Sequence, residues 1–301
     1  MRFLITGGTG FIGKALCRRL VDHGHQLLVL TRQEGQYTEG ANPRFLCWDP
    51  GGPGEWQSLV ERTDVIVHLA GEPVAGGRWT AKRKTALSAS RINSTRALVS
   101  AMAKANPRPS LLINASAVGY YGHRRDEELN EGSVPGKGFL SELSREWENA
   151  ALEAESLGVR VVMLRLGAVL GPEGGMLEKM VPPFRFFMGG VPGSGRQWLS
   201  WVHLEDVTGL IEFCARHEHF KGPINATSPN PCSMKEFCST LGQVLKRPSW
   251  LPIPGLLLKL GLGQFSDIIL NSQKVKPAVA LELGYNFRYP DLRSALEASV
   301  C

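Results

Sequence analysis

The stretch Thr6-Gly7-Gly8-Thr9-Gly10-Phe11-Ile12-Gly13 decides the fold. Residues 2–6 form an apolar run typical of a short buried strand, and residues 14–21 continue with the apolar spacing of a helix. The glycines therefore lie at a strand-to-helix turn, where free N–H groups at the helix N-terminus bind a dinucleotide pyrophosphate. A glycine-rich turn without a ligand is the alternative. Three glycines serve, in order, the tight turn, the close approach of phosphates and the packing of helix on strand: Gly7, Gly10 and Gly13.

The end of the next strand predicts which dinucleotide binds. Residues 26–30 are apolar and lead into Thr31 and Arg32, about 20 residues beyond the glycines. A carboxylate at this point would bind the ribose 2′-hydroxyl of NAD, whereas an arginine suits the 2′-phosphate of NADP. We therefore predict NADP(H) as the cofactor. The alternative is that Arg32 is a solvated residue that opens the loop 33–40.

Composition and cysteine content indicate an ordinary protein of a reducing compartment. The chain has 301 residues, of which 43% are hydrophobic and 21% charged, enough for a sizeable core. The first strand follows the initial methionine directly, so we expect no cleavable signal. No apolar run reaches the roughly 18 residues of a membrane helix, and the six cysteines have no metal-ligand spacing. We expect a cytoplasmic protein with no membrane partner and no metal.

Positive charge is concentrated in one part of the chain. The formal net charge is +6, and residues 73–125 contain no Asp or Glu but many Lys and Arg, while the following segment is acidic. No aromatic interleaving or DNA-binding motif accompanies this block, so we expect no nucleic-acid partner. An anionic cofactor explains the block most simply, and an anionic small-molecule substrate is a second explanation. For most of these residues a solvated helix face suffices.

Strand and helix patterns alternate along the first part of the chain. Strand-like runs lie at 44–48, 64–69, 110–115 and 159–166, and the helical patterns between them lie at 80–104 and 139–157. This alternation predicts an α/β fold, a Rossmann doubly wound parallel sheet. Ligands bind at the carboxyl ends of such strands. We therefore expect the residues after the strand at 64–69 to line the adenosine side of the cleft: Leu69, Ala70 and Gly71.

The amino-acid composition of the chain changes after residue 171. Residues 173–201 are rich in Gly, Pro, Phe and Met, and further helix and strand patterns follow near 204–215, 224–227, 234–245 and 291–298. We predict an NADP-binding Rossmann domain at 1–171 and a smaller C-terminal substrate-binding lobe at 172–301. The second segment is expected to add some strands and helices to the core sheet.

Motifs along nearly the whole chain resemble those of a known family. TGGTGFIG at 6–13, HLAG at 68–71, LRLGAVLGP at 164–172 and WVHLED at 201–206 resemble the extended, epimerase/dehydratase-like short-chain dehydrogenase/reductases. RW at 78–79, SR at 90–91, SAVGYYG at 116–122 and GSGRQ at 193–197 resemble the NADP-binding epimerase-family proteins in particular. These are sometimes labelled sugar-nucleotide epimerases or cell-division inhibitors. A nucleotide-sugar substrate would follow only from this analogy of fold.

The resemblance assigns cofactor contacts to several further positions. It implies that Thr9, Phe11 and Ile12 join the three glycines around the pyrophosphate, and that Thr31 and Arg32 hold the 2′-phosphate. It also places Val169 near the nicotinamide. Arg91, within the basic block, is expected on the cofactor or on the floor of the active site.

The chain departs from the superfamily at the catalytic residues. Catalytic members use a Ser together with a Tyr-x-x-x-Lys pair at the start of the helix that follows, in which the lysine lowers the pKa of the tyrosine. Ser116 is present here, but Phe139 and Leu143 replace the pair, and neither can transfer a proton. Tyr120 and Tyr121, after the strand that ends near Ser116, are candidate substitutes if Arg91 lowers the pKa of one phenol. The alternative is that both rings only pack beneath the C-terminal lobe.

Two classes of function therefore stay open. One is an oxidoreductase or epimerase with a non-standard active site, which moves hydride at the nicotinamide with Ser116, Tyr120 and Tyr121 as candidate catalytic residues. The other is a non-catalytic NADP(H)-binding sensor or scaffold. The sequence leaves the substrate and the oligomeric state undetermined.

Overall fold

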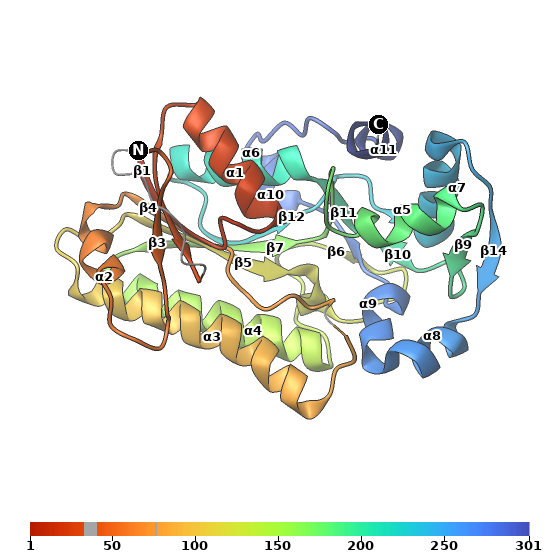
Figure 1. The fold of residues 1–301 in the computed structure, drawn as a ribbon, viewed down its shortest axis with the longest axis horizontal. Helices are drawn as coiled ribbons and strands as arrows, with labels where there is room; N and C mark the ends of the chain where they lie inside the picture. Colours follow the sequence, from red (N-terminus) through yellow and green to blue (C-terminus); the bar gives the residue numbers. More distant parts are fainter. Residues whose placement is uncertain (33–40, 76, 301) are drawn as a thin grey trace.

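A parallel sheet forms the centre of the protein (Figure 1). The computed structural model describes residues 1–32, 41–75 and 77–300, and the loop predicted at 33–40 lies outside them. Within the described residues the sheet has seven strands in the order β12-β7-β5-β4-β1-β2-β3, all parallel. The bounds are β1 (Arg2–Thr6), β2 (Gln26–Thr31), β3 (Arg44–Cys47), β4 (Val65–His68), β5 (Leu111–Ala117), β7 (Arg160–Leu166) and β12 (Gly222–Ala226). The predicted Rossmann sheet is confirmed.

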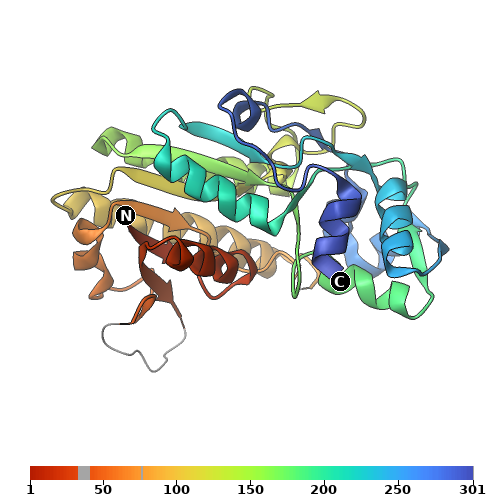
Figure 2. The same ribbon diagram turned by 90° about the horizontal axis from the view of Figure 1, so that it is seen from above.

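Helices cover both faces of this sheet (Figures 1 and 2). One face carries α1 (Phe11–Asp22), α6 (Leu204–Arg216) and α10 (Ala278–Glu282). The opposite face carries α2 (Trp56–Leu59), η1 (Val60–Arg62), α3 (Ala81–Lys104), α4 (Phe139–Leu152) and η3 (Glu153–Leu157). Both faces are covered, which explains why the central strands are almost continuously apolar.

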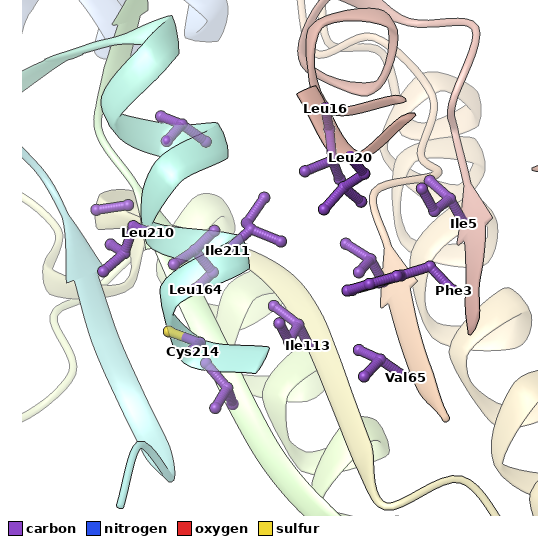
Figure 3. Close-up of a cluster of buried hydrophobic side chains, with 14 of the residues drawn as sticks. Phe3, Ile5, Leu16, Leu20, Val65, Ile113, Leu164, Leu210, Ile211 and Cys214 are labelled. Carbon is purple, nitrogen blue, oxygen red and sulfur yellow. The ribbon is translucent and has the colours of Figure 1, made fainter. Parts of the chain in front are cut away.

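Alternation along each strand divides the core into two layers. Phe3 and Ile5 of β1 point to the α1 and α6 side, while Leu4 points to the α3 side. Figure 3 shows the first layer, where Leu16 and Leu20 of α1 face the sheet together with side chains of α6. Such apolar burial is the main contribution to stability.

The C-terminal segment builds its own small core and also extends the sheet. Its core cluster includes Trp201, Phe184 and Phe237. The elements are α5 (Leu177–Arg185), β9 (Gly189–Pro192), β10 (Trp198–Leu199), β13 (Cys232–Ser233), α7 (Met234–Leu245), β14 (Ser249–Ile253), α8 (Gly255–Leu262), η4 (Gly263–Ser266), α9 (Asp267–Leu270) and α11 (Leu292–Val300). In contrast, α6 and β12 belong to the Rossmann layers although they follow residue 172.

Short elements join the two parts. β8 (Ala168–Leu170) pairs in parallel with β11 (Trp201–His203), and β6 (Glu128–Leu129) pairs with β15 (Lys274–Val275). A 3-10 turn, η2 (Val118–Tyr121), follows β5. Among the described helices, none combines the length and the apolarity that a membrane crossing requires. Within the same residues, His, Cys, Asp and Glu form no group of three or more that could hold a metal ion.

The third glycine of the motif fixes the position of α1. A Cβ atom at Gly13 would lie 2.1 Å from the carbonyl oxygen of Gly7 and 2.6 Å from the Cα of Gly8. Both neighbours are backbone atoms, so neither can rotate away. Gly7 has a φ of +71°, which favours glycine there as well.

We predict that Gly13→Ala lowers the free energy of unfolding by about 3 kcal/mol, because α1 must move away from the turn. Gly261→Ala is the matched control, since no atom lies within 4 Å of the Cβ it would add to α8. This control should leave the stability unchanged or raise it by up to about 1 kcal/mol. Chemical denaturation of both variants measures the difference, and equal effects would contradict the assigned role of Gly13.

Candidate functional site

Two adjoining cavities lie at the carboxyl ends of the central strands. The first has a volume of about 460 Å³ and the second of about 370 Å³. They share Gly7, Gly10 and Leu69, so they meet at the glycine turn. The first is lined by residues of the β2 and β4 ends, and the second by residues of β5, α4 and the segment after β7. This is the crevice in which doubly wound sheets bind ligands.

The N-terminus of α1 points free N–H groups at the junction of the cavities. Gly10 is the N-cap, no side chain caps the helix, and its first turn holds no acidic residue. A Cβ at Gly10 would meet only the oxygen of Gly7, at 3.2 Å. Packing within the protein therefore does not fill the outer side of Gly10. The turn has the free donors and the space that a pyrophosphate group requires.

The first cavity is lined by one cationic side chain, Arg32, and by two carboxylates, Asp49 and Glu72. Thr31 and Arg32 line it at the end of β2, and the Arg32 side chain is exposed to solvent. Trp48, Asp49 and Pro50 line the same cavity after β3. The sequence analysis did not predict these three residues, because nothing in their spacing shows that the loop after β3 turns toward the loop after β2.

A buried hydrogen-bond chain fixes the ends of β1 and β4. The Thr6 hydroxyl oxygen accepts the backbone N–H of Ala70 at 3.2 Å and lies 2.5 Å from His68 Nδ1. His68 Nε2 lies 3.0 Å from the Ser94 hydroxyl, which donates to helix carbonyls of α3. Burial, followed by the charge of Arg91, lowers the pKa of His68 from 6.5 to about 3. The imidazole is therefore neutral and holds the cavity wall in place.

Arg91, predicted on the cofactor or on the floor of the active site, lines the second cavity. Its guanidinium donates to the carbonyl oxygens of Leu87 and Glu72, both at 3.1 Å, and lies 5.1 Å from the ring centroid of Trp147. Burial lowers the pKa of Arg91 to about 10, so it still carries its charge at neutral pH. The guanidinium also lies against Gly71, which lines the first cavity, and the nearby charge of Glu72 favours its charged form.

The lining of the second cavity is mostly apolar, and α4 contributes side chains at helical spacing. Leu140, Leu143, Ser144 and Trp147 face the cavity. Phe139 does not, because its ring packs outside, 5.4 Å from the ring of Trp79 and 5.0 Å from Lys84 Nζ. Of the two residues proposed to replace the Tyr-x-x-x-Lys pair, only Leu143 therefore lies at the cavity.

Ser116 is the polar residue of β5 that lines this cavity, and its hydroxyl contacts a buried ion pair. Its hydroxyl donates to Glu148 Oε1 at 2.6 Å. Arg165 binds the same carboxylate in a bidentate manner, with both distances 2.8 Å. Although burial opposes its charge, Glu148 raises the pKa of Arg165. The sequence did not indicate Glu148 and Arg165 as site residues, although Arg165 lies in the LRLGAVLGP motif at 164–172.

Tyr120 and Tyr121 lie behind this ion pair and not at the cavity. The Tyr121 hydroxyl is fully buried, donates to Asn225 Oδ1 at 2.7 Å and accepts from Arg165 at 2.9 Å. Burial, despite the nearby Arg165, raises the pKa of Tyr121 to about 12, opposite to the lowered value expected of a proton carrier. Tyr120 packs its ring on the Arg165 guanidinium at 3.5 Å. The predicted approach of Arg91 to either phenol is not observed, because η2 turns both rings toward β7.

The other predicted site residues do come together. The thirteen positions assigned to the cofactor all line one or both cavities: Gly7, Thr9, Gly10, Phe11, Ile12, Gly13, Thr31, Arg32, Leu69, Ala70, Gly71, Arg91 and Val169. Phe11 also contacts a glycine-rich loop at 171–175, where a Cβ at Gly174 would lie 2.4 Å from its ring. No residue after 169 is among those that line these two cavities.

Comparison with known families identifies this architecture. Residues 3–226 match the model of the NAD dependent epimerase/dehydratase family, which is more than half of the chain. The chain belongs to this family. Residues 253–299 of this epimerase/dehydratase-family protein match a domain of unknown function (DUF1731), so the second match begins after β12 and α7.

Relatives of this family member are similar over its whole length. It is 42% identical to the chloroplastic epimerase family protein SDR39U1 homolog of Arabidopsis thaliana, covering 99% of this chain and 86% of that one. It is 39% identical to the epimerase family protein YfhF of Bacillus subtilis, covering 98% and 97%. The crystal structure of human epimerase family protein SDR39U1 with NADPH matches with a TM-score of 0.89 and 32% identity, covering 99% and 98%. That relative holds the cofactor predicted here from Arg32.

We predict that His68 makes stability depend on pH. Because the folded pKa is about 3 and the ordinary value is 6.5, the unfolded chain binds a proton first as the pH falls. This contribution to stability is complete above pH 6.5 and is lost toward pH 3, with a slope of about 1.4 kcal/mol per pH unit. In His68→Gln, the measured slope of unfolding free energy against pH should fall by about 1.4 kcal/mol per pH unit between pH 4 and 6. Ser94→Ala, which removes no titrating group, should lower stability at every pH and keep the slope.

Proposed function

We propose that this protein is an NADP(H)-dependent oxidoreductase or epimerase-type enzyme with a non-standard active site. The observation that carries the proposal is the pair of adjoining cavities that meet at the N-terminus of α1. The first suits the adenosine half of a dinucleotide, with Arg32 at the 2′-phosphate, and the second suits the nicotinamide half. The NADPH bound by human SDR39U1 supports the same choice of cofactor.

The substrate is proposed to be a small, mainly apolar carbonyl compound or alcohol. Apolar side chains from several elements dominate the second cavity, among them Val74, Leu140, Leu143 and Trp147. Nicotinamide takes part of the 370 Å³, so little space is left for a large ligand. Arg91 is a charged group at which an anionic end of the substrate could bind. The five cysteines in the described part of the chain are free, which supports the cytoplasm as the proposed location.

Ser116 and Glu148 are proposed to take the place of the missing Tyr-Lys pair. NADP(H), when bound, supplies or accepts the hydride. In the direction of alcohol oxidation, Ser116 Oγ accepts the substrate hydroxyl proton while Ser116 passes its own proton to Glu148 Oε1. In the direction of carbonyl reduction the same two protons return. Arg165 orients the carboxylate through both oxygens.

A second candidate is a non-catalytic NADP(H)-binding sensor or scaffold. The specific observation in its favour is that the four α4 side chains at the cavity are two leucines, a serine and a tryptophan. None of them titrates, and Glu148 reaches the cavity only through Ser116. A protein that binds NADP(H) and turns over no substrate would have this lining.

We predict that Arg32→Asp weakens NADPH binding about a hundredfold, because it removes a charge-assisted hydrogen bond to the 2′-phosphate and adds repulsion. NADH affinity should change by less than about threefold, since NADH has no such phosphate. Titration calorimetry with NADPH and with NADH measures the change in affinity for each cofactor. Arg18→Asp is the control, because Arg18 is exposed on α1 outside both cavities and should affect neither cofactor. Equal losses of NADPH and NADH in Arg32→Asp would contradict the assigned contact.

We predict that Ser116→Ala and Glu148→Gln each reduce turnover at least a hundredfold on a panel of aldehydes, ketones and quinones, while NADPH affinity stays within about threefold. Ser144→Ala is the matched control, since its side chain lines the same cavity without being part of the ion pair. It should stay within about threefold of wild type. NADPH binding without turnover by the wild-type protein would favour the sensor, and a failure to bind NADPH would contradict both candidates.

A further inference from the structure

The far end of the C-terminal lobe has a large apolar surface exposed to solvent. Three pieces of the chain, at 186–188, 250 and 256–260, form this surface. Seven large apolar residues on them are each between 57% and 73% exposed: Phe186, Phe187, Met188, Trp250, Leu256, Leu257 and Leu260. We call this set the lobe patch. Single exposed apolar residues are ordinary, but a contiguous group of this size marks an interaction site.

The three pieces are contiguous in space. Phe187 precedes β9, which pairs in parallel with β14, and the indole nitrogen of Trp250 donates to the Phe187 carbonyl oxygen at 3.1 Å. β14 then leads directly into α8, which lies at the end of the molecule remote from β1 to β3 (Figure 1). Leu256, Leu257 and Leu260 project from α8, a helix without a buried residue.

Basic side chains predominate at the lobe patch, and the nearest acidic residues around Arg185 are Glu173 and Glu178, which line a cavity with it. Residues 179–204 and 237–266, which contain the patch, hold six Lys and Arg, and their acidic neighbours in the sequence lie at the borders of these segments: Glu178, Glu205, Glu236 and Asp267. Arg247 lies over the ring of Phe187 at 4.6 Å, and Lys246, Lys259 and Arg185 are exposed beside the apolar residues. Arg78, from the loop before α3, donates to carbonyl oxygens at the end of α8 and adds a further cation. The surface is therefore complementary to an anionic partner.

This charge pattern argues against a second copy of the chain as the partner. A two-fold interface would place the same patch against itself and bring its predominantly basic side chains together. Strand pairing between copies is also disfavoured, because Pro252 is exposed within β14, Pro254 follows the strand directly, and neither can donate a backbone hydrogen bond.

We propose that the lobe patch binds the surface of an anionic phospholipid bilayer. Protruding Trp, Phe and Leu side chains with Lys and Arg at their edge are the composition of an interfacial membrane contact, in which apolar groups enter the headgroup boundary and cations bind acidic headgroups. A bound peptide instead requires a groove, and these side chains project outward. The sequence predicted no membrane partner because no apolar run reaches the roughly 18 residues of a membrane helix. A surface contact requires no such span.

The test is co-sedimentation of the full chain with vesicles of phosphatidylcholine alone and with 30% phosphatidylglycerol, a mixture chosen as roughly that of an acidic leaflet. The wild-type protein should bind the acidic vesicles at least tenfold more strongly and release in high salt. Trp250→Ser/Leu256→Ser/Leu260→Ser should lose at least tenfold of this binding. Lys259→Gln/Arg185→Gln should lose several-fold on acidic vesicles only.

The matched control is Val134→Ser/Leu281→Ser/Leu283→Ser, which removes three exposed apolar residues outside the lobe patch and should bind as the wild type does. Thermal unfolding establishes that each variant is folded. Absence of binding to acidic vesicles, or equal loss in the control, would overturn the proposal. A wild-type dimer that the patch variant converts to a monomer, measured by light scattering, would assign the patch to a second copy. Binding of an acidic peptide in place of acidic vesicles would also overturn it.

Discussion

The close backbone contact between α1 and the turn after β1 is the constraint on which the rest of the site depends. No side chain fits between Gly13 and Gly7, so the helix axis and the direction of its first N–H groups are fixed by main-chain atoms. The Thr6, His68 and Ser94 hydrogen bonds then fix β4 and α3 relative to this turn. These contacts position both cavities, because the two cavities lie next to each other and share Gly7 and Gly10 of the glycine turn.

The ion pair of Glu148 and Arg165 determines what the second cavity can do. A buried carboxylate without a partner would be strongly destabilising, and the bidentate contact with Arg165 supplies that partner next to Ser116. The same guanidinium donates a hydrogen bond to the Tyr121 hydroxyl oxygen and packs on the Tyr120 ring. One side chain thus explains both why Ser116 has a carboxylate partner and why neither tyrosine reaches the cavity.

The sequence predicted the sheet, the cofactor turn and the positions that line the cavities, because local patterns determine them. Gly7, Gly10 and Gly13 act within one turn, and Arg32 follows from the end of one strand. Local patterns do not predict which side of a helix or strand faces an element that is distant in the sequence. The pairing of Glu148 with Arg165 depends on which sides of α4 and β7 face each other. Phe139 and Leu140 differ by one residue, or about 100° around a helix, and only Leu140 reaches the cavity.

The central position of β1 has a consequence for how the chain folds during its synthesis. β1 is synthesised before its sheet neighbours β2 and β4 and before the covering helix α6, which ends at residue 216. The apolar side of α1 that packs on α6 in the finished protein therefore stays uncovered until residue 216 has emerged. The loop at 171–175 that encloses the Phe11 ring is also made late. The apolar side of α1 and the Phe11 ring are therefore covered only by segments that are made much later in the chain.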